Sequence, residues 1–310
     1  MRILIVDEMH PSIVEMPKAL GLDVDYYPNI AFEEVLERVG VYDGLIIRSK
    51  FAINEAFLSH ASNLKFIGRA GAGLDLIDLT ACKKAGVTVF GANEANKVAV
   101  AEHLIGMLLS LLHKINTGSR EVKEGQWNRE ANRGEELFGK TVGIIGYGNN
   151  GQATAERLAA FGCKILAYDR YKYGFGTHVI TECDMPEIYE KADIVSLHIP
   201  LTKESDKWVD KGFFDKFEKP IIFCNIARGE IAVLKDLVAA MQDGKVKGAC
   251  LDVLENEKLK TLTEEQKASF DYLANQNNVI LTPHVAGWST ESYVKINEVL
   301  RDKIKRLLEV

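Results

Sequence analysis

The sequence predicts an α/β fold with two doubly wound domains, each built on a parallel sheet covered by helices. Short apolar runs of strand length alternate with amphipathic helical stretches from one end of the chain to the other, which is typical of parallel α/β folds. The length of 310 residues suits two domains of the usual ~100–200 residues better than one. A composition that is 47% hydrophobic and 26% charged is ordinary for a folded protein.

The first half of the chain predicts a small doubly wound domain, because strand-like runs and short helical segments follow one another there. We expect its strands at Ile3–Val6, Val24–Tyr27, Leu45–Ile47, Phe66–Gly68 and Val87–Phe90. We expect its helices near Pro17–Leu20, Ala31–Val39, Glu55–Ser59 and Leu76–Lys84.

A second α/β series begins at Lys140. Six strands joined by helical crossovers are what two mononucleotide-binding halves need. We expect these strands at Val142–Ile145, Lys164–Tyr168, Ile194–Leu197, Ile221–Cys224, Gly248–Leu251 and Val279–Leu281.

Two long helical runs set the domain boundaries. Val98–Leu112 is apolar on several faces, so we expect burial on more than one side, either between domains or at a subunit interface. Glu291–Leu308 is long enough to leave the second domain and pack on the first. We therefore assign residues 1–97 and 288–310 to one domain, and residues 98–287 to the other.

Charge and cysteine content exclude several classes of protein. A formal net charge of −6 argues against a nucleic-acid partner, which normally requires a basic face. The five cysteines are widely spaced and never form C-x-x-C, so we expect reduced thiols, no disulfide framework and no metal site. No segment is long and apolar enough for a signal peptide or a membrane span. We expect a cytoplasmic protein.

A glycine motif follows the first strand of the second series. Gly146, Gly148 and Gly151 form G-x-G-x-x-G between an apolar run and a helical stretch, which favours a dinucleotide pyrophosphate at the helix N-terminus. The motif alone also fits an ordinary flexible loop. The next strand, however, ends in Asp169, whose carboxylate suits the adenosine ribose hydroxyls and repels a 2′-phosphate. This favours NAD over NADP, although Arg170 partly offsets the charge.

Three polar residues follow later strands, where open α/β sheets place their chemistry. They are Arg228, Glu257 and His284. Each alone is more often an ordinary surface or loop residue. Together they could supply a histidine base held by a carboxylate, and an arginine fork for a carboxylate of a ligand.

With the segment Ile67–Asp75, these motifs resemble the D-isomer-specific 2-hydroxyacid dehydrogenases, most closely their phosphoglycerate dehydrogenase-like branch, over essentially the whole chain. The resemblance implies a flavodoxin-like substrate domain and a Rossmann domain that binds NAD. It also implies that Arg228 binds substrate, Glu257 supports the histidine and His284 is the acid/base.

The resemblance implies roles for further positions. Beside the three glycines and Asp169, the cofactor site takes Asn149, Asn150, Pro200, Ala227, Asp252 and Gly287, with Asp252 at the nicotinamide amide. The substrate carboxylate takes the loop Ala70, Gly71, Ala72 and Gly73, and a substrate phosphate would take Arg48, Lys50, Arg69 and Lys97. These four cations fit an ordinary surface equally well. We interpret His198 as structural.

The leading functional hypothesis is oxidation of D-3-phosphoglycerate in serine biosynthesis, with reduction of hydroxypyruvate or glyoxylate as the alternative. A different class also stays open, namely an NAD-responsive binding protein without turnover.

The sequence ends directly after the return helix, so we expect no regulatory domain. We expect a homodimer through Val98–Leu112, and Arg129 and Arg133 lie in a segment that some relatives extend towards the partner's site.

Overall fold

A computed structural model describes residues 1–309; Val310, the last residue assigned to the first domain, lies outside the described residues. The chain forms two compact units. Unit 1 contains Met1–Asn96 and the segment that starts at Trp288, and unit 2 contains Lys97–Gly287. These bounds differ from the expected ones only at Lys97.

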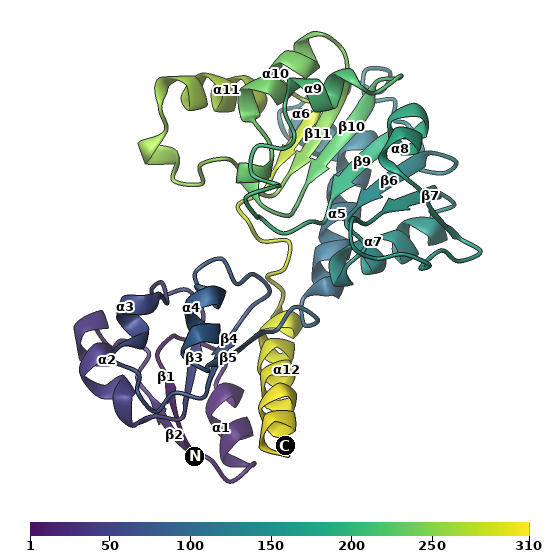
Figure 1. Ribbon diagram of the computed structural model, residues 1–310. Helices are drawn as coiled ribbons and strands as arrows, with labels where there is room; N and C mark the ends of the chain where they lie inside the picture. The colour runs from purple at the N-terminus through teal and green to yellow at the C-terminus, as the bar shows by residue number, and fades with distance from the viewer. Residues whose placement is uncertain (310) are drawn as a thin grey trace. The chain divides into compact units, whose positions relative to one another are not determined.

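Unit 1 is a parallel five-stranded sheet with the order β2-β1-β3-β4-β5, the order of flavodoxin-like folds. Each face of the sheet is buried: Leu4 packs in one apolar core, and Ile3 and Ile5 pack in the other. The strands are β1 (Arg2–Ile5), β2 (Asp23–Tyr26), β3 (Gly44–Ile47), β4 (Phe66–Arg69) and β5 (Thr88–Gly91). The helices, seen in Figure 1, are α1 (Ser12–Lys18), α2 (Phe32–Arg38), α3 (Glu55–Leu58), α4 (Leu79–Lys84) and α12 (Thr290–Leu308).

The last helix returns to this first sheet, as the sequence predicts. Leu300 and Ile304 of α12 are fully buried in the core that contains Ile3 and Ile5. The first helix differs from the prediction, because α1 begins at Ser12, directly after Pro11, and Pro17 lies inside it. Proline is common at the start of a helix, so either Pro11 or Pro17 could mark the start of this one. The helix begins after the earlier proline, Pro11, because this start buries the side chain of Ile13.

Unit 2 is a parallel seven-stranded sheet with the order β12-β11-β10-β9-β6-β7-β8, an extended Rossmann order. The strands are β6 (Thr141–Ile145), β7 (Lys164–Tyr168), β8 (Ile180–Glu182), β9 (Ile194–Leu197), β10 (Ile221–Asn225), β11 (Val246–Leu251) and β12 (Val279–Leu281). The helices are α5 (Lys97–Leu112), α6 (Ile115–Lys123), α7 (Asn149–Ala160), α8 (Met185–Lys191), α9 (Lys211–Asp215), α10 (Leu234–Gln242) and α11 (Glu264–Ala274). The expected six strands are present, and β8 is an additional one.

Packing within unit 2 accounts for the broad apolar surface of helix α5. Val100, Leu104 and Leu108 are buried in the core that covers one face of the seven-stranded sheet, where α5 packs against α7, β11 and β12. Burial is therefore confirmed for the face of Val98–Leu112 that packs within unit 2, and burial between domains is not tested. A subunit contact through this helix remains a prediction.

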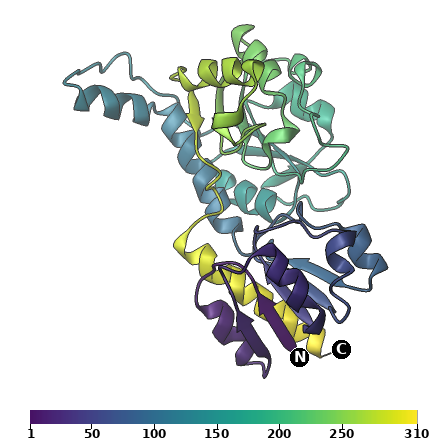
Figure 2. The same ribbon diagram turned by 90° about the vertical axis from the view of Figure 1, so that its left-hand side faces the viewer.

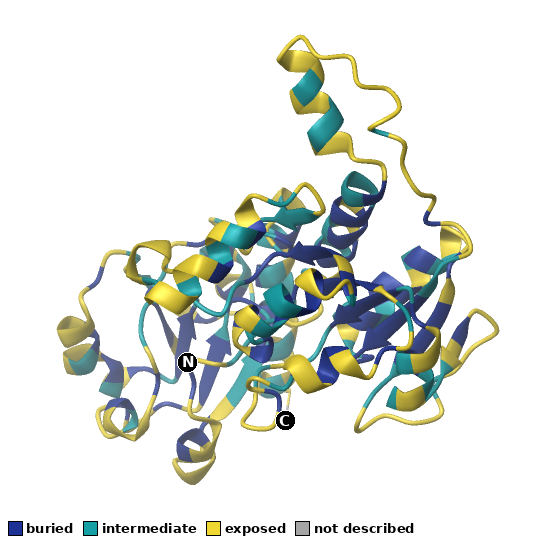
Figure 3. Cartoon of the chain, turned by 90° about the horizontal axis from the view of Figure 1, so that it is seen from above, coloured by how far each residue is buried: buried dark blue, intermediate teal, exposed yellow. Residues whose placement is uncertain are grey.

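Helix α6 and the chain after it project from the rest of unit 2 (Figures 2 and 3). None of the residues of α6 is buried, and Trp127 is 83% exposed. Arg133 in this arm forms an ion pair with Glu130. Within residues 1–309, no single helix is long and apolar enough to cross a membrane; α5 and α6 pass that test only as a pair, bent by 61°.

Candidate active site and nucleotide site

The glycine loop lies between β6 and β9, where the winding of the seven-stranded sheet reverses. Ligands of open α/β sheets bind at this switch point. Gly146 has a φ of +96°, and a Cβ there would lie 2.6 Å from the main-chain oxygen of His198. A Cβ on Gly151 would lie 2.0 Å from the oxygen of Gly146. Side chains at these two positions would push the strand, loop and helix apart.

The start of α7 faces this turn. The helix begins at Asn149, directly after Gly148, so its first amides are available to an anion. The side-chain oxygen of Asn150 is buried without a hydrogen-bond partner. An unsatisfied buried polar atom beside a helix N-terminus fits a site that a polar ligand completes.

Asp169 fastens the glycine loop to the loop after β7. Its Oδ2 accepts a hydrogen bond from the amide of Tyr147 at 2.8 Å. Its Oδ1 accepts from the amides of Tyr171 and Lys172 at 2.9 and 3.1 Å. Three bonds leave little further acceptor capacity on this carboxylate, so Asp169 has a structural role at the rim in addition to any contact with a ribose.

A pocket of about 320 Å³ opens beside these residues. Its size and mostly apolar lining suit an adenosine group. Gly146, Gly148, Asp169 and Pro200 of the predicted cofactor set line it, whereas Ala227, Asp252 and Gly287 do not. Tyr171, Glu204 and Trp208 complete its rim.

His198 lines the same pocket. Its Nδ1 is buried without a partner, and its Nε2 lies 3.0 Å from the hydroxyl of Ser196. Burial lowers the pKa of this imidazole from its usual 6.5 to about 3, so the ring is neutral near pH 7. A neutral, buried ring agrees with the structural role expected from the sequence.

His284 and Glu257 form a pair after β12 and β11. Nδ1 of His284 lies 2.9 Å from a carboxylate oxygen of Glu257, and both side chains are about half exposed. The backbone of His284 has a φ of 54°, a left-handed conformation that is unfavourable for residues other than glycine and is often found at functional sites. Its amide donates to the main-chain oxygens of Asp252 and Thr282, which hold this conformation.

Asp252 anchors the histidine loop from inside the unit. Its carboxylate is 1% exposed and accepts from the amides of Val285 and Ala286 at 2.9 and 2.8 Å. The Thr282 hydroxyl donates to it at 2.6 Å. The contact of Asp252 with a nicotinamide amide remains a prediction, because the groups that donate to its carboxylate in the structure all belong to the protein.

His103 is a further member of this cluster that sequence reasoning missed. It lies on α5, and its Nε2 is 3.0 Å from the Thr282 hydroxyl and 3.6 Å from a carboxylate oxygen of Asp252. It is separated from Thr282 by 179 residues along the chain. Nothing in its local sequence marks this contact.

Arg228 follows β10 in extended conformation. Its Nη1 donates to the main-chain oxygen of Ala227 at 2.7 Å, and its own oxygen accepts from the Asn225 side chain at 2.9 Å. The next residue, Gly229, approaches the loop after β11 so closely that a Cβ would lie 1.9 Å from the oxygen of Leu254. This contact joins the loop that carries Arg228 to the loop that leads to Glu257.

The predicted carboxylate loop lies in unit 1, directly after β4. The amides of Ala70 and Gly71 donate to the main-chain oxygens of Ile47 and Arg69, both at 2.8 Å. Only the amides of Ala72 and Gly73 therefore remain for a substrate carboxylate within this loop.

The predicted phosphate cations of unit 1 have different surroundings. The ammonium of Lys50 donates to the main-chain oxygens of Pro28 and Ile30, which gives it a structural role. Nε of Arg69 donates to the oxygen of Arg48 at 3.1 Å. Lys97 belongs to unit 2 and not to unit 1.

Among these cations, Arg48 is the one best placed to bind a phosphate. It follows β3 at the switch point between β1 and β3, where the Asp7 carboxylate accepts its amide at 2.6 Å. Its guanidinium lies 4.2 Å from the ring centroid of Trp288. Within residues 1–309 that guanidinium has no ion pair or hydrogen bond. Sequence reasoning did not single out Trp288.

A Rossmann sheet with a glycine loop at its switch point and a histidine–carboxylate pair at its strand ends defines a nucleotide-dependent dehydrogenase class. Residues 105–286 match the family described as D-isomer specific 2-hydroxyacid dehydrogenase, NAD binding domain. The chain belongs to this family, and unit 2 carries its NAD-binding domain. The resemblance and the expected cofactor are confirmed.

Two relatives illustrate the range within the family. D-3-phosphoglycerate dehydrogenase of Archaeoglobus fulgidus is 32% identical over 98% of this chain and 56% of its own length. Hydroxypyruvate reductase of Thermotoga maritima is 34% identical over 90% of this chain and 89% of its own length. The chain thus spans about half the length of the phosphoglycerate dehydrogenases that it matches.

Solved structures show the same fold with different nucleotides. D-lactate dehydrogenase of Aquifex aeolicus, complexed with NAD and lactic acid, has a TM-score of 0.83 and 27% identity, covering 99% of this chain and 95% of its own. An acyclic imino acid reductase in complex with NADPH and D-Arg has a TM-score of 0.86 and 25% identity, covering 100% and 97%. The fold alone therefore does not decide between NAD and NADP.

Proposed function

We propose that this protein is an NAD-dependent oxidoreductase that acts on a D-2-hydroxy acid, with Arg228, Glu257 and His284 as its catalytic residues. The contact between His284 and Glu257 carries the proposal, because a histidine oriented by a carboxylate is what proton transfer at a hydroxyl group requires. The strained backbone of His284 and the buried anchor below it support an acid/base role over that of an ordinary loop residue.

His284 moves the proton. An ionised Glu257 can only accept, so the hydrogen of their bond is on Nδ1, and Nε2 is left as the base. In oxidation, Nε2 takes the proton of the substrate hydroxyl, and Glu257 stabilises the imidazolium that forms. In reduction, the same nitrogen returns the proton to the keto oxygen. NAD, when bound, supplies the acceptor for the hydride that leaves carbon 2.

Arg228 orients the substrate in unit 2. The guanidinium is a planar donor that can hold a carboxylate and polarise a keto oxygen. In unit 1, the amides of Ala72 and Gly73 are suited to a carboxylate. Holding these groups in place fixes carbon 2 relative to the acid/base.

For the substrate, we propose 3-phosphoglycerate first and hydroxypyruvate or glyoxylate as the alternative. The phosphoglycerate dehydrogenases among its relatives support the first, and Arg48 supplies an uncommitted cation for a phosphate. The alternative is favoured by the structural role of Lys50 and by the nearly full-length match to a hydroxypyruvate reductase. A short acid needs fewer cations than a phosphorylated one.

The test is turnover measured at 340 nm with a panel of substrates. D-3-phosphoglycerate is supplied with NAD, and hydroxypyruvate, glyoxylate and pyruvate are supplied with NADH. Preferred turnover of phosphoglycerate supports the first assignment, and preference for an unphosphorylated keto acid supports the alternative. If none of these acids is turned over although NADH still binds, both substrate assignments would give way to the hypothesis of an NAD-responsive binding protein.

We further propose a homodimer in the cytoplasm. The part of α5 that its own unit leaves exposed includes Glu102 and Gly106, which narrows the expected contact to that side of the helix. Sedimentation of the purified protein tests it, and a monomer at micromolar concentration would exclude it.

A further inference from the structure

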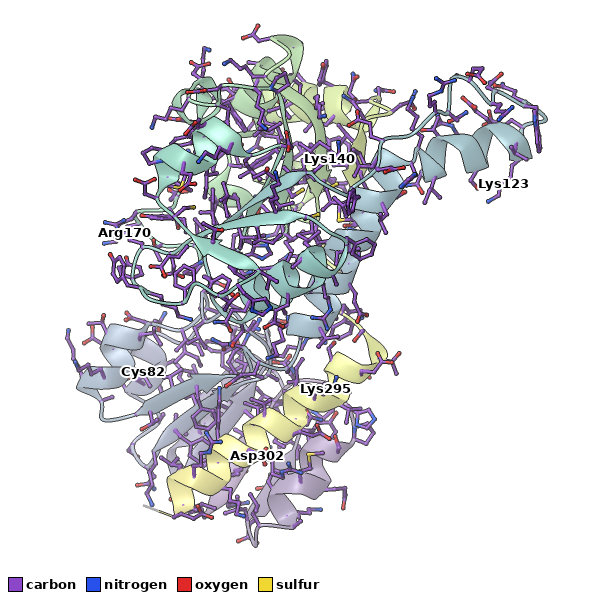
Figure 4. The ribbon with its side chains drawn as sticks, turned by 90° about the vertical axis from the view of Figure 1, so that its right-hand side faces the viewer. Cys82, Lys123, Lys140, Arg170, Lys295 and Asp302 are labelled. Atoms are coloured by element: carbon purple, nitrogen blue, oxygen red, sulfur yellow. The ribbon has the colours of Figure 1, made fainter. Side chains whose placement is uncertain are left out.

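An ion pair lies in the lining of the pocket beside the glycine loop. Nη1 of Arg170 donates to a carboxylate oxygen of Glu204 at 2.7 Å, and the Tyr171 hydroxyl donates to the same oxygen at 3.3 Å. The three residues line the pocket together with Asp169. Arg170 lies at the surface of unit 2 (Figure 4).

Both partners of this pair stand on loops that are fixed by their own hydrogen bonds. The loop of Arg170 is held by Asp169, which accepts the next two amides. On the other side, the Ser205 hydroxyl accepts the amide of Thr202 and donates to the oxygen of Pro200, both at 2.8 Å. Hydrogen bonds of the protein itself therefore hold both loops that carry Glu204 and Arg170, which favours a specific role for the pair.

The charges around the pocket explain what this role would be. Arg170 is the residue best placed by sequence to neutralise a ribose 2′-phosphate beside Asp169. The pair with Glu204 occupies one arm of its guanidinium and adds a second carboxylate to the rim. Lys172, the other nearby cation, donates to the oxygen of Tyr147 at 3.1 Å.

We propose that Glu204 is a second residue, beside Asp169, that selects NAD against NADP. It holds the Arg170 guanidinium away from a 2′-phosphate and repels that phosphate by its own charge. The inference rests on the nucleotide site of the proposed function, but not on the identity of the substrate.

The expected effect is moderate. Side chains of Arg170 and Glu204 are 60% and 58% exposed, and exposed ion pairs are weak and screened by salt. We expect Glu204→Gln to tighten NADPH binding by about three- to tenfold at low ionic strength, while NADH binding changes less than about twofold.

The experiment measures equilibrium binding of NADH and NADPH to the whole chain by calorimetry, without substrate. The variants are Glu204→Gln, Arg170→Gln and the double variant, at low and at high salt. Asp215→Asn is the matched control, because it removes a carboxylate from an exposed pair with Lys211 elsewhere on unit 2. It should leave both affinities unchanged.

The expected result is a selective gain for NADPH in Glu204→Gln that shrinks in the Arg170→Gln background and at high salt. Equal changes for both nucleotides, no change, or an undiminished gain without Arg170 would overturn the proposal. Failure of the unaltered protein to bind either nucleotide would instead remove the nucleotide site itself.

Discussion

Nδ1 of His284 lies 2.9 Å from Oε1 of Glu257, and the main chain of the same histidine is held by the oxygen of Asp252. The exposed pair and the buried anchor thus act on one residue from two sides. The exposed carboxylate of Glu257 orients the ring, and the buried carboxylate of Asp252 holds the loop after His284 through the amides of Val285 and Ala286.

The pair should matter for turnover. We expect Glu257→Gln to lower kcat/KM by roughly ten- to a hundredfold, because an amide cannot stabilise the imidazolium that forms on His284. Steady-state rates with the preferred acid measure this effect. Glu265→Gln, which alters an exposed carboxylate paired with Lys235, is the control. An unchanged kcat/KM in Glu257→Gln would separate Glu257 from the histidine.

Asp252 should matter for stability as well as rate. Asp252→Asn cannot accept the amides of Val285 and Ala286 as an ionised carboxylate does, and we expect a loss of about 2 kcal/mol or more in the free energy of unfolding. Thr282→Val removes one donor to it and should cost about 1 kcal/mol. Urea unfolding of both variants is the measurement. A variant Asp252→Asn as stable as the parent would contradict the anchoring role.

Gly229 tests the contact between the loops of Arg228 and Glu257. A methyl group there meets the oxygen of Leu254 at 1.9 Å, so we expect Gly229→Ala to destabilise unit 2 by about 3 kcal/mol. Gly118→Ala in α6 is the matched control, because a Cβ there meets only the side chain of Asn132 at an ordinary 3.5 Å and alanine favours a helix. Equal urea midpoints for the two variants would show that the loops of Arg228 and Glu257 can move apart without a loss of stability.

The stack of Arg48 on Trp288 tests the substrate assignment. If the substrate carries a phosphate, Arg48→Gln should raise KM for 3-phosphoglycerate at least about tenfold, the effect of losing a charge-assisted contact. Trp288→Leu should raise it only about two- to fivefold, because a partly exposed cation–π contact is weak. Lys50→Gln should affect stability more than KM. Equal KM values in all variants would place the phosphate elsewhere or remove it.

His198 should make stability depend on pH under acidic conditions. Its pKa is lowered by burial to about 3 in the folded protein and returns to ~6.5 on unfolding. The unfolded chain therefore binds an extra proton between these values, and the stability that His198 contributes above pH 6.5 is lost as the pH falls towards 3. We expect His198→Gln to reduce the slope of unfolding free energy against pH between 4 and 6. An identical slope would mean that the ring is protonated in the folded protein.

The sequence predicted those parts of the molecule that depend on local order. The glycine loop, Asp169 and the strands of unit 2 other than β8 could be predicted, because apolar runs and turn residues follow one another at short range. Strand β8 was missed, since it has three residues and only Ile180 is buried. Helix α6 was missed because it buries nothing.

Contacts between distant segments gave no signal in the sequence. His103 meets Thr282, and Glu204 meets Arg170, only after the strands are in order. The same applies to Lys50, whose charge predicted a phosphate site but whose ammonium binds main-chain oxygens of another loop. A charge can be read from the sequence, whereas its partner depends on the fold.

The most direct test of the account compares hydride transfer and NADH binding in the parent protein and in His284→Ala. The panel of acids is assayed at 340 nm, and binding is measured separately by calorimetry. We predict turnover of at least one 2-hydroxy or 2-keto acid by the parent, a loss of ~10²–10⁴-fold in His284→Ala, and unchanged nucleotide affinity. Turnover that survives the loss of His284 would contradict the central claim.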